Sequence, residues 1–350
     1  MTPADLSLTV LHAVRRAVDD GALQVAAHDV PERIKVERPR PGGRGDYASN
    51  VALTLARAAR RPPLDVAAIL RDRLDRSPGL AAVDITGPGF LNFTLHTGAQ
   101  QDLVREILER GPRYGWREPT GAVAQPTYRA DVRAAVTADA VRRILVSQGY
   151  AVRTYCEDTA DPDWTELGVR IEAQGARGRL ATDIAPLPVP YTAAGLLDSL
   201  GLDAARWGLL ASAAHDQARV GHELLRQHDD NPLFRVRYAH SRTHALTRNA
   251  AQTGFRGDAS EPVENPDLLR ALGDHPAVLA AAARHRAPDR VARHLEVVAD
   301  ALLDFQHTVL PLGDEKPSAA HRSRLALAEA AGVVLAGGLT LLGIRAPHEI

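Results

Sequence analysis

Residues 291–309 read VARHLEVVADALLDFQHTV, and their apolar positions decide the architecture of the C-terminal half of this chain. Successive apolar positions are separated by four, three, four, three and four residues, which is the repeat of one helix face. They are Val291, Leu295, Val298, Leu302, Phe305 and Val309. A similar repeat runs through residues 325–338, so we predict a helical bundle with one shared core over residues 191–350. The polar residues 254–276 are expected to form a loop between its helices.

The segment before the bundle, residues 119–190, has a different pattern. Val132, Val136, Ala140 and Ile144 recur every four residues, and a strand-like run follows at 150–155. A strand, a helix and a second strand at this spacing predict one β-α-β unit of a parallel sheet. Residues 175–190 are rich in glycine and proline and lack periodicity, so we expect them to form a connector.

The first 118 residues combine helical and strand-like patterns. Apolar residues at helical spacing predict helices near residues 3–18 and 66–74. Two strands are predicted at 83–86 and 90–95, on either side of a Gly-Pro-Gly turn. The predicted fold class is therefore multidomain: an α+β domain over residues 1–118, a truncated Rossmann-like remnant over 119–190, and the all-α bundle over 191–350.

Composition excludes several classes of site in this chain of 350 residues. Its single cysteine, Cys156, cannot form an intrachain disulfide or a multi-cysteine metal site. His240 and His244 stand four residues apart, but no third ligand lies nearby, so we predict no metal site. Because the net charge is −1, nucleic acid could bind only through local basic patches. We find no apolar run of about 18 residues and no signal peptide, so we expect a cytoplasmic protein without a membrane contact.

One such basic patch is predicted within residues 231–256, which contain no acidic residue. On a helix that begins near Pro232, Arg235, Tyr238 and Arg242 share one face, and His240 lies on the neighbouring face. Guanidinium groups bind phosphates and an aromatic ring stacks on an unpaired base, so this face suits an RNA loop. The alternative is a solvated arginine-rich face without a ligand.

Motifs near both ends of the chain resemble those of arginyl-tRNA synthetases. GDYASNVA at 45–52 and GPGFLNF at 87–93 resemble their N-terminal tRNA-binding domain. DAARW at 203–207 resembles the motif that names their DALR anticodon-binding domain. DNP at 230–232, YAHSR at 238–242 and LLGIRAP at 341–347 also match that domain. The resemblance covers about two-thirds of the chain, in the order that the family has.

The family carries a class I catalytic domain between these flanks, and here the sequence departs from it. QPT at 125–127 stands where the family has Asn-Pro-Thr. The next positions replace the His-x-Gly-His signature and are degenerate: Tyr128, Arg129, Ala130 and Asp131. Residues 182–189 occupy the place of the Lys-Met-Ser-Lys-type loop without a lysine or an arginine. The resemblance therefore implies that the first β-α-β unit is kept and that most of the nucleotide-binding sheet is missing.

These losses bear on catalysis, because forming an aminoacyl-adenylate requires cationic groups around the triphosphate. A three-layer α/β active site cannot be built from one β-α-β unit. We therefore predict no catalytic residue and no cofactor, with ATP and arginine binding in doubt. Arg129 and Arg133, at the start of the predicted helix, could bind an anion there, but we expect both on the surface.

The leading interpretation is an arginyl-tRNA synthetase paralogue that binds tRNA, in particular an arginine tRNA, without activating arginine. The resemblance places Phe90 and Asn92 at the corner of the tRNA and Tyr238, His240 and Arg242 at its anticodon stem-loop, where Arg235 adds charge. A second interpretation is residual arginine–tRNA ligase or arginyl-transfer activity, alone or with a protein partner that supplies catalysis. A third is a protein-interaction module without RNA, which would be favoured if Arg235, Tyr238 and Arg242 were buried against another helix.

Overall fold

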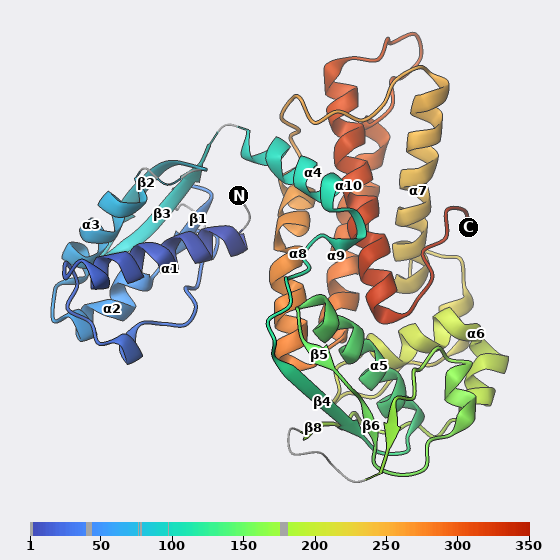
Figure 1. The fold of residues 1–350 in the computed structure, drawn as a ribbon. Coiled ribbons are helices and arrows are strands. Elements are labelled where there is room, and N and C mark those ends of the chain that lie inside the picture. The colour runs from blue at the N-terminus through green and yellow to red at the C-terminus, as the bar shows by residue number, and fades with distance from the viewer. Residues whose placement is uncertain (1–2, 40–43, 76, 78, 97, 176–180) are drawn as a thin grey trace. The chain divides into compact units, whose positions relative to one another are not determined.

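The computed structural model describes residues 3–39, 44–75, 77, 79–96, 98–175 and 181–350. The chain forms two compact units, Met1–Leu103 and Val104–Ile350 (Figure 1). The expected combination of an α+β domain, a parallel α/β segment and an all-α bundle is confirmed. The middle segment and the bundle lie together in the second unit.

The first unit is a three-stranded antiparallel sheet covered by helices. Its elements are α1 (Pro3–Asp19), η1 (Ala27–Asp29), β1 (Tyr47–Ser49), α2 (Val51–Ala59), α3 (Pro63–Leu74), β2 (Leu80–Thr86) and β3 (Phe90–Leu95). The strand order is β1-β3-β2, so β3 is the central strand. Leu91 and Phe93 of β3 are fully buried in a core that α1, α2 and α3 complete with Leu6, Leu55 and Leu70. Thr2, which directly precedes the predicted helix near residues 3–18 and is its expected N-cap, lies outside the described residues.

The parallel sheet of the second unit is larger than the sequence indicates. Its strands are β4 (Val123–Tyr128), β5 (Ala151–Val152), β6 (Tyr155–Cys156), β7 (Ala173–Gln174) and β8 (Ala181–Ile184). β4 pairs in parallel with β5, β6 and β8, and β6 pairs in parallel with β7. The expectation of a single β-α-β unit is therefore wrong, as is that of a plain connector after residue 175. The run predicted at 150–155 contains β5 and the start of β6, whereas β7 and β8 were missed because they are too short to show an alternating pattern.

Helix α5 (Val132–Ser147) packs between this sheet and the helices of the bundle (Figure 1). Asp131 caps its N-terminus, where the carboxylate accepts a hydrogen bond from the backbone N–H of Ala134 at 2.9 Å. The helix ends just before Gly149, whose φ of 82° and close approach to the Glu118 carbonyl exclude a side chain. The polar loop between residues 156 and 173 contains the short helix η3 (Pro162–Thr165).

The bundle consists of long helices linked by shorter elements. Its elements are α6 (Ala193–Leu210), η4 (His222–Leu225), α7 (Pro232–Gln252), α8 (Pro266–His285), α9 (Asp289–Phe305), η5 (Gln306–Thr308) and α10 (Ala319–Leu342). Helix α4 (Ala99–Arg110) and η2 (Gly111–Arg113) precede the sheet. All six apolar residues quoted from 291–309 are buried. Residues 266–276 were expected in a loop but belong to α8, because Asn265 caps a helix that continues through Pro276.

Helix α10 lies among the other helices of the bundle. Gly332 approaches Thr243 of α7 and Gly338 approaches Leu295 of α9, so closely that a side chain at either glycine would clash. By length and hydropathy α10 could cross a membrane, contrary to the expectation that the chain has no such apolar run. In this structure 72% of the most apolar stretch of α10 is buried inside the protein, as in a core helix.

Candidate functional site

The degenerate signature positions lie where β4 ends and α5 begins. Tyr128 is buried against Trp164, and burial raises the pKa of its hydroxyl. Arg129 and Ala130 are exposed, and Asp131 is the cap of α5. This is the carboxyl end of a parallel strand, the usual position of a ligand in an open α/β sheet.

A cavity of about 340 Å³ lies at this end of the sheet. Three carboxylates line it, those of Asp131, Glu157 and Asp183, and among the described lining residues Arg129 alone is basic. The hydroxyl of Thr127 donates to Asp183 at 3.1 Å, which joins β4 to β8 across the floor of the cavity. The described lining therefore has more acidic than basic side chains.

Arg133 is not on the surface, contrary to the expectation from sequence. Its side chain is buried, and its five N–H groups donate to backbone carbonyl oxygens at 2.7–3.3 Å. The acceptors are the carbonyls of Leu187, Leu209, Ser212, Ala213 and Asp216. Leu187 follows β8, and the other four acceptors lie at or just after the end of α6. This one guanidinium therefore holds both segments to α5. Burial lowers the pKa of Arg133, and nearby carboxylates offset part of this decrease.

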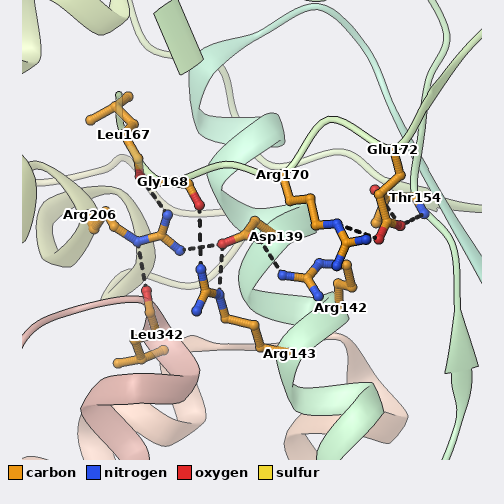
Figure 2. A network of polar contacts seen from close by, with 10 residues as sticks. All are labelled: Asp139, Arg142, Arg143, Thr154, Leu167, Gly168, Arg170, Glu172, Arg206 and Leu342. Atoms are coloured by element: carbon orange, nitrogen blue, oxygen red, sulfur yellow. Dashed lines mark hydrogen bonds and ion pairs between the residues drawn. The ribbon is translucent and has the colours of Figure 1, made fainter. Parts of the chain in front are cut away.

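A second buried polar centre surrounds Asp139 of α5 (Figure 2). Its carboxylate contacts Arg142, Arg143 and Arg206, each at 2.8–2.9 Å. Burial alone would raise the pKa of Asp139, but the three guanidinium groups outweigh it and lower that pKa.

Arg206, from the DAARW motif on α6, links that centre to two further elements. It is fully buried and also donates to the carbonyls of Leu167 and Leu342, at 2.7 and 2.8 Å. The motif thus joins the sheet segment to the end of α10 (Figure 2). The spacing of Asp139, Arg142 and Arg143 was a visible signal for half of this network. The DAARW motif marked Arg206, but nothing in the sequence indicated that it pairs with Asp139.

The predicted RNA-binding face of α7 lies within one helix, as expected, but its charges are shared with other elements. Arg235 pairs with Glu296 at 3.8 Å and Asp300 at 3.2 Å, both on α9. Arg242 donates instead to the neutral amide oxygen of Gln306 at 2.8 Å, so its charge is not neutralised by this bond. Arg235, Tyr238 and Arg242 are all half-buried. Their exposure therefore lies between that expected for a solvent-facing RNA-binding face and that expected for a face packed against another helix.

Further along α7, His240 is 3% exposed and hydrogen-bonds through Nδ1 to the Pro347 carbonyl at 2.8 Å. Its Nε2 lies 3.3 Å from that of His244, whose ring stacks on His348 with a centroid distance of 3.9 Å. Burial, followed by the neighbouring histidines, lowers the pKa of His244 to about 4. The described residues contain no group of three or more side chains suited to a metal ion.

In the first unit, Phe90 and Asn92 occupy different environments on β3. Phe90 is 39% exposed, which leaves its ring accessible. Asn92 is 3% exposed, and its amide donates to the Thr86 hydroxyl at 2.7 Å and toward the Phe90 carbonyl at 3.5 Å. Asn92 thus stabilises the turn that presents Phe90.

Comparisons with known proteins find matching families near both ends of the chain. Residues 8–95 match the family described as the arginyl tRNA synthetase N terminal domain. Residues 236–350 match the DALR anticodon binding domain. Arginine–tRNA ligases of Frankia alni and Renibacterium salmoninarum are each 28% identical, over alignments that cover both chains completely. The first alignment has 560 positions, so more than a third of them have no residue in this chain.

Solved structures with a similar fold include two arginyl-tRNA synthetases. An arginyl-tRNA synthetase from Thermus thermophilus aligns over 100% of both chains with a TM-score of 0.74 and 15% identity. The enzyme from Plasmodium falciparum aligns over 99% of both, with a TM-score of 0.68 and 8% identity. Two domain families in order, full-length relatives and a shared fold lead to one conclusion: this chain is an arginyl-tRNA synthetase-like protein with a shortened middle segment.

Proposed function

We propose that this protein binds tRNA, specifically an arginine tRNA, and does not form arginyl-adenylate. The observation that carries the proposal is the contrast between its ends and its middle. Both flanking domains match tRNA synthetase families, whereas carboxylates dominate the cavity at the end of β4. Among the described residues that line this cavity, Arg129 alone could offer a guanidinium to a triphosphate.

The RNA contacts proposed for the bundle centre on Arg242 and Tyr238. The hydrogen bond of Arg242 goes to a neutral amide oxygen and not to a carboxylate, so its guanidinium suits a phosphate. Tyr238 stacks on Phe234 at 5.5 Å, which fixes the orientation of its half-buried ring. In the first unit, Phe90 supplies an accessible ring for a base. His240 and Asn92 support these contacts from buried positions.

A filter-binding titration with an arginine tRNA transcript tests binding. The logarithm of the affinity should fall linearly with the logarithm of the salt concentration. Arg242→Gln should lower the slope by about 1. Arg270→Gln, at an exposed ion pair on α8, is the matched control and should behave as wild type. If wild type fails to bind tRNA at low salt, the proposal is wrong.

Arginine-dependent exchange of pyrophosphate into ATP tests the second half of the proposal. We expect no exchange above the level of a protein-free control. The competing interpretation is residual ligase activity, and the parallel sheet with its cavity gives that interpretation its physical basis. Exchange by the purified chain, or after addition of a separately encoded partner, would favour that interpretation.

A further inference from the structure

A second cavity, of about 310 Å³, lies in the second unit and shares Pro186 with the carboxylate-lined one. Its walls come from α5, from residues 209–216 at the end of α6, and from residues 285–293, where α8 ends and α9 begins. None of the residues proposed above for RNA contact lines it. Arginines predominate among the charged residues of its lining, whereas acidic residues predominate in the first cavity.

The deepest charge in this cavity wall is that of Arg133. All of its five N–H groups are directed at neutral carbonyl oxygens. These bonds satisfy the donors but do not neutralise the positive charge. A buried charge is usually balanced by an ion partner, so this wall favours an anion in the cavity beside it.

Three further arginines line the cavity from the α8–α9 region. Arg286, which caps the end of α8, and Arg290, in the first turn of α9, are both exposed, and Arg293 lies one turn further along α9. Arg286 makes only a long hydrogen bond, of 3.4 Å, with the Thr182 hydroxyl among the contacts of its side chain with described residues. Its backbone φ of 52° is the left-handed cap of α8, which directs the chain toward α9.

The acidic residues of the lining do not balance these charges. Asp289 is paired with Arg293, which removes one charge of each sign. Asp216 lies 3.8 Å from His215, another lining residue. The guanidinium groups of Arg133, Arg286 and Arg290 therefore face one remaining carboxylate. A phosphate group, which accepts several guanidinium hydrogen bonds at once, fits this balance of charge.

We propose that this arginine-lined cavity binds a backbone phosphate of the same tRNA, through Arg286 and Arg290 and beside the buried charge of Arg133. The inference rests on the proposed function, and it places a phosphate contact at the junction between the sheet segment and the bundle. A phosphodiester is favoured over a free phosphate because both contributing arginines are exposed, one at the end of α8 and one at the start of α9, where a long polyanion can reach both.

The test uses the full chain and compares Arg286→Gln/Arg290→Gln with Arg284→Gln. Arg284 is an exposed arginine two residues before Arg286 and does not line the cavity, which makes it the matched control. Filter binding with an arginine tRNA transcript between 50 and 200 mM salt gives affinity and slope. A calorimetric titration with inorganic phosphate measures the free ion. Thermal unfolding checks that the variants remain folded.

We expect the double variant to bind tRNA about tenfold more weakly, with a salt slope smaller by about 1 to 2. Arg284→Gln should match wild type. Equal tRNA binding by wild type and the folded double variant would overturn the inference while leaving the proposed function intact. Tight phosphate binding that needs Arg290, with unchanged tRNA binding, would also overturn it in favour of a free-phosphate site. If wild type does not bind tRNA, the proposed function fails and the inference fails with it.

Discussion

Asp139 is a single buried carboxylate shared by three guanidinium groups, and it shows how much of this fold depends on individual polar residues. Removing it leaves Arg206 with no exposed surface and no ionic partner among the described residues. Unpaired buried charges are far costlier than missing surface pairs. A change of one atom at this position should therefore affect the whole second unit.

We predict that Asp139→Asn lowers the free energy of unfolding by about 3–5 kcal/mol, as measured by urea denaturation. Because the pKa of Asp139 is lowered in the folded state, its contribution is present above the unfolded carboxyl pKa of about 3.9. It is lost as the pH falls further, through the folded value. Asp72→Asn, at an exposed pair with Arg71, should cost less than about 1 kcal/mol. Similar losses for both variants would contradict this account.

At the scale of elements, Asn231, the residue directly before α7, has two structural roles. The side-chain oxygen of Asn231 accepts from the Leu233 backbone N–H at 3.1 Å and caps the helix. Its amide donates to the carbonyls of Leu224 and Arg226, both at 2.8 Å, which fixes η4 and the residue after it. We predict that Asn231→Ala destabilises the protein by about 1–3 kcal/mol in thermal or urea unfolding. Asn249→Ala, at an exposed position on the same helix, should change stability little.

The contact between α8 and α9 contains two buried histidines, His275 and His294, with ring centroids 5.2 Å apart. Burial lowers the pKa of His294 to about 4 and that of His275 well below 6.5. As the pH falls below 6.5, the unfolded chain gains protons that the folded chain excludes, so the free energy of unfolding decreases. The decrease attributable to His294 ends once the pH is below its folded value of about 4.

We predict that urea denaturation at pH 7, 6 and 5 shows this decrease, with each histidine contributing up to about 1.4 kcal/mol per pH unit. His294→Gln should reduce the dependence by up to that amount. His28→Gln, whose side chain is exposed, is the control and should keep the wild-type dependence. A wild-type stability that does not change between pH 7 and 5 would refute the prediction.

At the scale of the molecule, the two compact units have separate cores. We predict two unfolding transitions in calorimetry, one for each unit. Leu70→Ala removes a fully buried side chain of the first core and should destabilise that unit by about 2–5 kcal/mol. Asp139→Asn should shift the other transition. A single transition that both substitutions shift equally would show that the units unfold together.

The sequence by itself determined the class and order of the elements. Apolar repeats over several helical turns predicted α5, α9 and α10, because amphipathic periodicity is a local property of the chain. Motifs of contiguous residues indicated the two flanking domains for the same reason. The side chains at the signature positions were also readable directly, because these positions are contiguous in the chain.

Tertiary structure alone decided how charges are balanced and where the short strands pair. The arginines of α7 looked unopposed in sequence, but Arg235 meets acids on α9 that lie about sixty residues away. Arg133 looked exposed, yet its five acceptors lie more than fifty residues further along the chain. A strand of two to four residues is likewise defined by its partners. Electrostatic pairing and parallel strand pairing are long-range in sequence, so local patterns do not encode them.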